Sequence, residues 1–345
     1  MRQVKPVKVG DCTLDGKHIY IQSMLNTRSD DIEGSAAQAA ALEQAGCEII
    51  RAAIPNRDAI ALIPAIKERI HIPLVADIHF DYQLALEAAA AGIDKIRINP
   101  GNIGGMDRVR AVVKACQERS IPIRIGVNSG SLEKEILAKY GAPTAEALVE
   151  SAMGHVRMLE ACDFDNIVIS MKSSDVNTMI EAYRLCARQC HYPLHLGVTE
   201  AGTERMGLIK SAIGIGTLLH DGIGETIRVS LTEDPVKEIK AAQDILKCLG
   251  KRGGPQIVSC PTCGRTRIDL VKTAKEVEAA LEHVEKDIKV AVMGCVVNGP
   301  GEAREADIGI AGGDGCAVLF RKGKVLRKVP ETEIVPELMA EIEKL

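Results

Sequence analysis

The sequence predicts an N-terminal (β/α)₈ barrel followed by a small α+β domain, and three observations indicate this fold. From about residue 18 to residue 248, short β-branched segments alternate with longer amphipathic segments rich in Ala, Leu and Glu. Eight such units in about 230 residues match the size of a (β/α)₈ barrel. A segment rich in glycine, proline and charge then interrupts the pattern, as linkers do, and a differently patterned segment follows.

Eight segments of the first domain have the composition of strands. In chain order they are Ile19–Met24, Glu48–Ile54, Pro73–His79, Lys95–Pro100, Pro122–Asn128, Asn166–Lys172, Pro193–Thr199 and Thr226–Leu231. A doubly wound sheet is the alternative, but no GxGxxG turn follows the first predicted strand. The barrel is therefore the better prediction.

Amphipathic segments between these strands predict the helices of the barrel. They include Glu33–Ala45, Tyr82–Ala91, Met106–Arg119, Ala145–Cys162 and Val176–Gln189. A glycine before the next strand, as in Ala91-Gly92-Ile93, is typical of a helix C-terminus. The regular alternation of the two kinds of segment predicts parallel strands covered by helices.

The chain after the barrel predicts a small α+β domain. We expect the barrel domain to span residues 1–248, a linker to span 249–258 and the small domain to span 259–345. The small domain is predicted to contain a helix, a strand, further strands around turns and a closing helix, over Asp269–Lys286, Lys289–Met293, Asp307–Leu326 and Glu331–Lys344.

Composition limits the function classes. The formal net charge of -4 argues against general binding of nucleic acid, and no apolar run approaches the roughly 20 residues that span a bilayer. No apolar signal segment is visible at the N-terminus, so we expect a cytoplasmic protein without a membrane partner. Eight of the eleven cysteines have apolar neighbours and are expected to be reduced, buried thiols: Cys12, Cys47, Cys116, Cys162, Cys186, Cys190, Cys248 and Cys316.

Polar residues gather at the ends of the predicted strands, where barrel enzymes carry their chemistry. Five of them are cationic: Arg51, Arg97, Arg124, Lys172 and Arg228. Each could pair with a nearby carboxylate, but the only strand-end carboxylates visible are Asp77 and Glu200. Because unpaired charges are costly in a barrel interior, the surplus predicts an anionic ligand such as a phosphate or diphosphate ester.

Two of the other polar residues have alternative interpretations. Asp77 and His79 lie on one side of their strand and could begin a metal site, but no third ligand is apparent, which favours hydrogen bonding. Glu200 precedes a helix, where a carboxylate can stabilise the helix N-terminus or act as a catalytic acid or base.

Three thiols and a glycine-rich turn form a second candidate site. Cys260-Pro-Thr-Cys263-Gly supplies a pair of thiols, and Gly294-Cys295-Val-Val-Asn298-Gly299-Pro-Gly301-Glu302 supplies a third with a nearby carboxylate. Cys316 is a rival fourth ligand and His283 a weaker one. A structural zinc site is the alternative, but three thiolates with an uncertain fourth ligand favour an iron–sulfur cluster with a reactive corner.

The motifs of both sites resemble those of the 4-hydroxy-3-methylbut-2-enyl diphosphate synthase family of the non-mevalonate isoprenoid pathway. The resemblance covers the whole chain in the shorter, two-domain bacterial form. It rests on Leu-Val-Ala-Asp77-Ile-His79-Phe, Arg97-Ile-Asn99-Pro-Gly101-Asn102, Arg124-Ile-Gly-Val-Asn128-Ser-Gly, Gly197-Val-Thr-Glu200-Ala-Gly, Ser259-Cys260-Pro-Thr-Cys263-Gly-Arg and Met293-Gly-Cys295-Val-Val-Asn-Gly-Pro-Gly-Glu302.

The resemblance implies an oxidoreductase that opens the ring of 2-C-methyl-D-erythritol 2,4-cyclodiphosphate with two electrons and loss of water. It implies a [4Fe–4S] cluster held by Cys260, Cys263, Cys295 and Glu302, in a domain similar to the cluster-bearing part of sulfite and nitrite reductases. It also implies flavodoxin or ferredoxin as electron donor and a head-to-tail homodimer.

The resemblance further assigns roles to the barrel residues. Glu200 is expected to act in proton transfer beside the cluster, so that the catalytic residues are Glu200 and Glu302. The residues expected to bind the substrate are Arg51, Asp77, His79, Arg97, Asn99, Arg124, Asn128, Lys172, Arg228 and Ser230.

Overall fold

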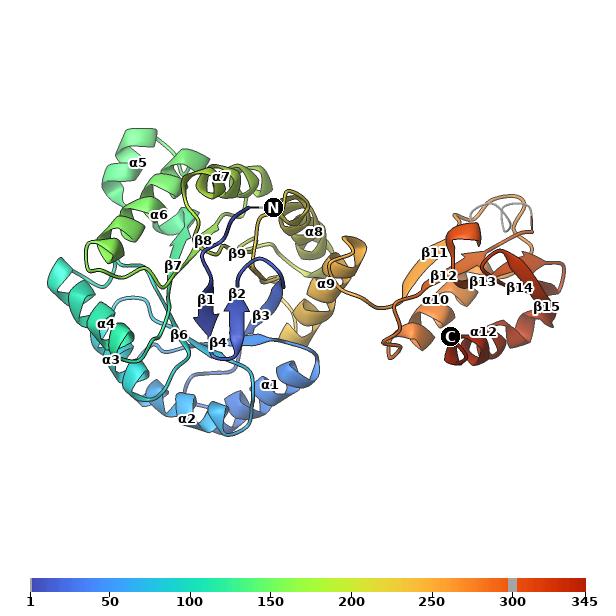
Figure 1. Ribbon diagram of the computed structural model, residues 1–345, viewed down its shortest axis with the longest axis horizontal. Coiled ribbons are helices and arrows are strands. Elements are labelled where there is room, and N and C mark those ends of the chain that lie inside the picture. The colour runs from blue at the N-terminus through green and yellow to red at the C-terminus, as the bar shows by residue number, and fades with distance from the viewer. Residues whose placement is uncertain (1, 297–302) are drawn as a thin grey trace. The chain divides into compact units, whose positions relative to one another are not determined.

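The computed structural model of the chain describes residues 2–296 and 303–345. These residues belong to two compact units, Met1–Leu249 and Gly250–Leu345 (Figure 1). The first unit is a barrel of strands surrounded by helices, and the second is a sheet with helices packed against it.

The barrel of the first unit has eight parallel strands in the order β8-β7-β6-β5-β4-β3-β10-β9. A parallel bridge between Ile169 of β8 and Leu194, the residue before β9, brings the two ends of this order together. The strands are β3 (Tyr20–Met24), β4 (Ile49–Ala53), β5 (Leu74–Asp77), β6 (Lys95–Ile98), β7 (Ile123–Asn128), β8 (Ile167–Lys172), β9 (His195–Leu196) and β10 (Thr226–Ile227). The predicted barrel is confirmed.

The last two barrel strands are shorter than the sequence predicts. Only His195–Leu196 and Thr226–Ile227 form regular pairs, although Arg228 N still donates to Leu196 O at 2.9 Å. Beyond this hydrogen bond the chain leaves the ladder and enters the loops that precede the next helices. The predicted residues after Leu196 and Ile227 therefore lie in loops above the sheet.

Helices cover the outside of the barrel (Figure 1). They are α1 (Ile32–Gln44), α2 (Leu62–Lys67), α3 (Tyr82–Ala90), α4 (Met106–Glu118), α6 (Ala145–Glu160), α7 (Val176–Gln189), α8 (Glu204–His220) and α9 (Pro235–Cys248), with the extra short helix α5 (Lys134–Tyr140) before α6. Several begin after a side chain that accepts a hydrogen bond from a first-turn N–H: Asp31, Asp81, Thr144, Asp175 and Asp234.

The main hydrophobic core lies between the barrel and its helices. Outward-facing strand residues such as Ile50, Ile96 and Ile125 are fully buried in this core. The inward positions differ from the branched apolar layers usual in such barrels, because many of them are polar. The barrel interior is therefore a polar environment enclosed by an apolar shell.

A short hairpin before the barrel was not predicted. Its strands β1 (Val7–Val9) and β2 (Cys12–Leu14) are joined through Gly10, which has a φ of 53°. Three-residue strands are too short to give a periodic pattern, which is why the sequence did not reveal them. The hairpin packs its apolar side chains against Val168 and Tyr20, at the beginnings of β8 and β3, and so covers the N-terminal end of the barrel (Figure 1).

The second unit is a five-stranded mixed sheet in the order β11-β12-β13-β14-β15. Its strands are β11 (Gln256–Ser259), β12 (Lys289–Met293), β13 (Ile308–Gly313), β14 (Cys316–Arg321) and β15 (Lys324–Pro330), and its helices are α10 (Leu270–Leu281) and α12 (Ile334–Glu343). β11, β12 and β13 are parallel, whereas β14 and β15 are antiparallel. The helices and the sheet bury a second apolar core, so the predicted α+β composition is confirmed.

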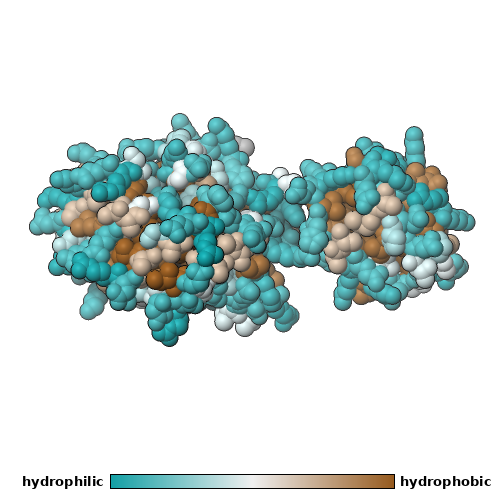
Figure 2. All heavy atoms as spheres, turned by 90° about the horizontal axis from the view of Figure 1, so that it is seen from below, coloured by the Kyte–Doolittle hydropathy of each residue, from teal (hydrophilic) through white to brown (hydrophobic). Residues whose placement is uncertain are grey.

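The face of each unit that Figure 2 shows is mainly polar. Figure 2 shows a mostly hydrophilic face on each unit, with smaller hydrophobic areas between the polar side chains. Among the described residues, every helix is too short or too polar to cross a membrane.

Candidate active site

The strand registers stack the inward side chains of the barrel in layers of four from alternate strands, as in barrels with a stagger of about eight residues. One layer consists of Arg51, Arg97, Ser170 and Arg228, and we call it the arginine layer. The layer beneath it consists of Gln22, Val75, Arg124 and His195. The layer above the arginine layer consists of Met24, Asp77, Gly126 and Gly197. The next layer toward the carboxyl ends of the strands consists of Ala53, Asn99, Lys172 and Ser230.

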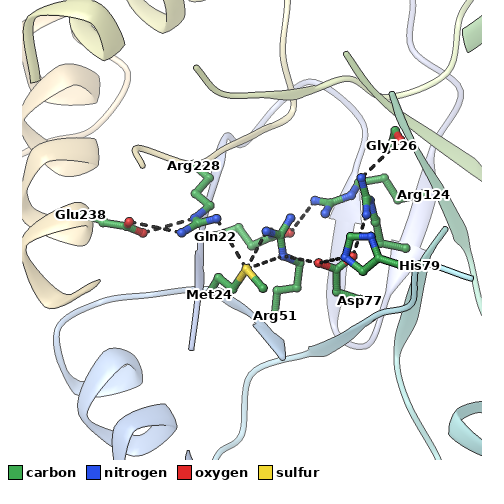
Figure 3. A network of polar contacts seen from close by, with 10 residues as sticks. Gln22, Met24, Arg51, Asp77, His79, Arg124, Gly126, Arg228 and Glu238 are labelled. Carbon is green, nitrogen blue, oxygen red and sulfur yellow. Dashed lines mark hydrogen bonds and ion pairs between the residues drawn. The ribbon is translucent and has the colours of Figure 1, made fainter. Parts of the chain in front are cut away.

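Asp77 is the carboxylate that lies among these cations (Figure 3). Its Oδ1 is 3.0 Å from Arg97 Nη1, and its Oδ2 is 3.7 Å from Arg51 Nε and 3.5 Å from His79 Nε2. Burial alone raises the pKa of this carboxyl, but Arg51, His79 and Arg97 outweigh burial and hold the pKa well below its ordinary value. Asp77 is therefore ionised at neutral pH and neutralises one of the charges around it.

A thioether occupies the position between two of the arginines. Arg51 Nη2 donates to Met24 Sδ at 2.6 Å, and Arg228 Nη1 lies 3.6 Å from the same sulfur (Figure 3). A thioether is a weak acceptor without charge, so it does not neutralise either guanidinium. Burial and the neighbouring arginines lower the pKa of Arg51 to about 10, which leaves it charged at neutral pH.

Glu238 supplies a carboxylate that the sequence interpretation missed. It lies in the first turn of α9, and its Oε1 is 3.3 Å from Arg228 Nη2 (Figure 3). Its Oε2 accepts from Ser23 Oγ at 3.0 Å. The buried face of α9 includes Pro235, Glu238 and Ile239, a helical spacing that could have placed this carboxylate toward the barrel. The prediction counted carboxylates at strand ends and so did not include Glu238, which reaches Arg228 from a helix.

The remaining two cations have no carboxylate partner within the described part of the chain. Arg124 Nη1 donates to Gln22 Oε1 at 3.2 Å, and Lys172 is buried at the end of β8. Burial and the surrounding cations lower the pKa of both groups. Five cationic side chains thus face the interior with Asp77 and Glu238 as the carboxylates that contact them, and an anionic ligand is the group that this imbalance fits.

Two glycines make room for these cations. A Cβ at Gly126 would lie 2.2 Å from Arg97 Nε, and a Cβ at Gly197 would lie 2.8 Å from Arg228 O and 3.1 Å from Lys172 Nζ. Arg97 Nη2 also donates to Gly126 O at 3.3 Å. The absence of side chains at these positions therefore holds the guanidinium and the ammonium in the barrel interior.

The other predicted substrate residues surround this cluster. Asn99 is buried and accepts from Gly101 N at 3.1 Å, a turn contact within its own loop. Asn128 ends β7 and is partly buried, as is Ser230, which follows β10. His79 is about half exposed and is the member of this set nearest to solvent.

Glu200 lies apart from the arginine layer, in the loop after β9. Its side chain is exposed and its φ of 51° is unusual for a residue other than glycine. α8 is capped at Thr203 and begins at Glu204, so Glu200 does not lie in the first turn of that helix. Glu200 is therefore not the capping residue of α8, and strained backbone of this kind is concentrated at functional sites.

A cavity of about 340 Å³ opens beside the arginine layer. It lies where the loops after β3 and β10 meet the start of α9, and its lining includes Met24, Asn26, Arg228, Thr232 and Glu238. The cavity therefore gives solvent access to Arg228 from the carboxyl ends of the strands.

In the second unit, two of the three predicted thiols follow the carboxyl ends of neighbouring parallel strands. Cys260 comes directly after β11 and Cys295 two residues after β12, and Gly294 N donates to Cys260 Sγ at 3.3 Å. Arg267 N donates to Gly294 O at 2.9 Å, which fixes the CxxC turn against the second loop. Hydrogen bonds from backbone amides to cysteine sulfur are typical of thiolates that bind metal.

The third thiol is exposed on the same turn. Cys263 N donates to Thr266 Oγ1 at 3.2 Å, and hydrogen bonds from the backbone and side chain of Arg265 lower the pKa of the Cys263 thiol. A lowered pKa favours the thiolate, which is the form that binds metal. Within residues 2–296 and 303–345, no three Cys, His, Asp or Glu side chains are gathered as metal ligands. The predicted fourth ligand, Glu302, lies outside the described residues.

The two rival fourth ligands, Cys316 and His283, lie away from the loops that carry Cys260 and Cys295. Cys316 begins β14, two strands from β12 in the sheet order, which corresponds to about 10 Å. His283 is exposed just beyond the end of α10, where the chain returns to the beginning of β12. It therefore lies toward the end of the sheet opposite to the cysteines.

Comparisons with known proteins agree with this geometry. A family model described as the GcpE TIM-barrel domain matches residues 4–243, and one described as the GcpE protein C-terminal domain matches residues 256–344. The chain belongs to the GcpE family. The family resemblance found in the sequence motifs is thereby confirmed.

Curated relatives from the GcpE family match over nearly the whole chain. A protein of Clostridium perfringens is 60% identical over 344 residues, which cover 99% of both chains. A protein of Geobacillus kaustophilus is 58% identical, covering 99% of this chain and 92% of its own. Both are named 4-hydroxy-3-methylbut-2-en-1-yl diphosphate synthase (flavodoxin).

Solved structures of another family share the barrel fold. Dihydropteroate synthase from Stenotrophomonas maltophilia has a TM-score of 0.52 at 14% identity, covering 71% of this chain and 97% of its own. The enzyme from Xanthomonas albilineans has a TM-score of 0.52 at 15% identity, covering 72% and 99%. At this level of identity the likeness concerns the fold alone.

Proposed function

We propose that the chain catalyses the two-electron reductive ring opening of 2-C-methyl-D-erythritol 2,4-cyclodiphosphate to 4-hydroxy-3-methylbut-2-enyl diphosphate, with loss of water. The observation that carries this proposal is the arginine layer with its neighbours, in which five cations face one interior and two carboxylates contact them. A diphosphate supplies the negative charge that this interior needs, and guanidinium groups match phosphate oxygens in geometry. The names of the relatives in the GcpE family support the same reaction.

The cations have a role in binding and a role in bond breaking. Arg51, Arg97 and Arg228 share one layer and would hold the diphosphate, while Arg124 below and Lys172 above extend the positive field along the barrel axis. When the C–O bond of the ring breaks, negative charge develops on the phosphate oxygen that leaves. Fixed cations stabilise this charge without reorganisation during the reaction.

We assign the redox centre to the second unit. A [4Fe–4S] cluster bound by Cys260, Cys263, Cys295 and Glu302 would supply the electrons that the side chains of the protein cannot. The amide of Gly294 that donates to Cys260 Sγ and the lowered pKa of Cys263 support thiolate ligands in this loop pair. A carboxylate ligand such as Glu302 is more replaceable than a thiolate, which leaves one corner for a substrate oxygen.

Further residues and partners belong to the same proposal. Glu200 is the proposed proton donor to the leaving hydroxyl, since it is an exposed carboxylate beyond a strand end, on strained backbone. Flavodoxin is the proposed electron donor, as the names of the relatives indicate, and ferredoxin is the alternative. The predicted cytoplasmic location stays a prediction.

A head-to-tail homodimer is the proposed assembly. The reaction needs the cluster to reach the substrate, and the resemblance implies that two chains pair for this purpose. An exposed apolar stripe on α8, formed by Met206, Ile209 and Ile213, supports association with a second chain. Ile213→Glu is expected to increase the monomer fraction in light scattering after size-exclusion chromatography, and an unchanged mass would remove the stripe from the interface.

Two variants with matched exposed thiols test the cluster assignment. Protein purified without oxygen is expected to be brown and to contain about four irons and four sulfides per chain. Cys263→Ser is expected to lose this colour and its activity with reduced flavodoxin, while Cys248→Ser, on an exposed thiol at the end of α9, is expected to retain both. Colourless wild-type protein with one zinc ion per chain would reject the redox proposal and favour a structural zinc site.

A further inference from the structure

A buried lysine lies below the arginine layer and has no assigned role. Lys95 is the first residue of β6, and its register places it inward, in the layer with Ile49, Val168 and Thr226. Its side chain is fully buried, and its Nζ has no hydrogen-bond partner among the described residues. An ammonium in such a position is costly, because it has lost its water and gained no acceptor.

The groups above Lys95 share its lack of partners. Gln22 Nε2, Arg124 Nε and His195 Nε2 are buried and without hydrogen bonds in the described structure. All three belong to the layer between Lys95 and the arginine layer. Two of these groups, Gln22 Nε2 and Arg124 Nε, are donors that lack an acceptor in this part of the interior.

The titratable groups that face Lys95 add no negative charge. Arg51 on β4 and Arg124 on β7 are cationic, and burial lowers the pKa of His195 on β9, which leaves that ring neutral. Cys12 on β2 is a neutral thiol, because burial raises its pKa to about 11. The inward residues of the other strands at these levels are Gln22, Val75, Val168 and Thr226, which do not titrate near neutral pH.

Lysine is the group that can relieve this charge. A guanidinium does not lose its proton in proteins, whereas a buried lysine often does. Burial, Arg124 and Arg51 all lower the pKa of Lys95. The surroundings in the free protein therefore disfavour the charged form of Lys95, and a dianionic or trianionic ligand in the arginine layer would reverse the electrostatic potential that does so.

We propose that Lys95 is a positioning residue that takes up a proton when a diphosphate ester binds to the arginine layer, so that the charge of the barrel interior adjusts to the ligand. The inference rests on the proposed function for the nature of the ligand and adds a proton to its binding equilibrium. Lys95 acts through the field in the interior, since the layer of Arg124 separates it from the arginine layer.

The direction of the pH effect follows from linkage. If binding takes up protons, raising the pH opposes binding, so the dissociation constant of the ligand rises with pH. At pH 8 we expect the wild type to take up about one more proton per bound ligand than Lys95→Met does.

Calorimetric titration of the full-length, cluster-loaded protein with the cyclic diphosphate tests this inference. Titrations in two buffers that differ in ionisation enthalpy give the number of protons taken up per bound ligand. The slope of the logarithm of the dissociation constant against pH gives the same number independently. Lys114→Met is the control, because Lys114 is an exposed lysine on the outer face of α4.

The outcomes separate the two proposals. A loss of about one proton in Lys95→Met, with binding retained and Lys114→Met like the wild type, supports the inference. If Lys95→Met and the wild type take up the same number of protons, the inference is overturned. It is also overturned if the wild type binds the ligand without proton uptake, a result that can be obtained without any variant. Failure of the wild type to bind the cyclic diphosphate at all would instead reject the proposed function.

Discussion

Replacement of Asp77 by Asn removes the carboxylate that lies among the inward-facing cations. Asp77 Oδ1 is 3.0 Å from Arg97 Nη1 and Asp77 Oδ2 is 3.7 Å from Arg51 Nε. An amide of the same shape keeps the packing but carries no charge, so both guanidinium groups stay buried without their anion. We therefore expect Asp77→Asn to lower the free energy of unfolding and to strengthen the response of the protein to added anions.

The size of the effect follows from these distances. At an effective dielectric constant of about 20, unit charges 3.0 Å apart attract by about 5.5 kcal/mol and charges 3.7 Å apart by about 4.5 kcal/mol. Desolvation of the carboxylate offsets a large part of this attraction, and loss of one partner from a buried pair costs about 3–5 kcal/mol. We expect a loss of this size at pH 7.

Chemical denaturation of wild type and variant between pH 3 and pH 7 measures the effect. The folded-state pKa of Asp77 lies below its ordinary value, so its stabilisation is present above the unfolded-state pKa of about 4 and declines as the pH falls through that value. The difference between wild type and variant should therefore be largest from pH 5 to pH 7 and should narrow below pH 4. Sulfate should raise the thermal midpoint of the variant more than that of the wild type.

Asp30→Asn is the matched control, because Asp30 pairs with Arg28 on the surface and the same chemical change there should have little effect. Equal stability of Asp77→Asn and the wild type at pH 7 would refute the argument that Asp77 neutralises buried cations. An Asp77→Asn variant that is no more responsive to sulfate than the wild type would refute the argument that the interior seeks an anion.

Three further predictions concern other residues. Gly126→Ala should raise the dissociation constant of the cyclic diphosphate about 10- to 100-fold, because the new methyl group displaces the guanidinium of Arg97. Gly130→Ala is the control: a Cβ there meets no atom within 4 Å, so this variant should bind the ligand like the wild type in the same titration. Burial raises the pKa of Glu225 to about 7, so the folded state holds a proton that the unfolded state releases. The contribution of Glu225 to stability should therefore fall between about pH 4.5 and pH 7, and thermal scans should show the wild type losing stability relative to Glu225→Gln over this range. Glu238→Gln should lower the thermal midpoint by leaving Arg228 without its carboxylate, and an unchanged midpoint would contradict the pairing.

The barrel was predictable because its strands repeat a simple pattern. In Lys95-Ile-Arg97-Ile98 polar residues alternate with apolar ones, and the structure places the polar residues inward and the apolar ones in the helix-packed shell. The same alternation could have revealed Lys95 as an interior residue. Lys95 and Gln22 were not among the predicted site residues, because only residues near the strand ends were expected to carry the chemistry.

Other features depend on contacts between distant segments. Glu238 reaches Arg228 from a helix, and the hairpin of β1 and β2 is recognisable only from its packing on Val168 and Tyr20. The local sequence can indicate that Glu238 faces the barrel, but it does not fix the partners in either contact, because these depend on how the chain returns to the barrel. The thiols are the opposite case: the CxxC spacing predicted neighbouring ligands, and the parallel ends of β11 and β12 place Cys260 beside Gly294.

The central claim is that the chain opens the ring of the cyclic diphosphate with two electrons. The most direct test is to supply the cluster-loaded protein with the cyclic diphosphate and with reduced flavodoxin as electron donor. The measurement follows product by mass spectrometry and counts the electrons withdrawn from flavodoxin, without oxygen. We predict one 4-hydroxy-3-methylbut-2-enyl diphosphate for every two electrons. The claim would be contradicted if the cluster-loaded protein bound the cyclic diphosphate but formed no linear diphosphate. It would also be contradicted if the protein consumed electrons without forming product.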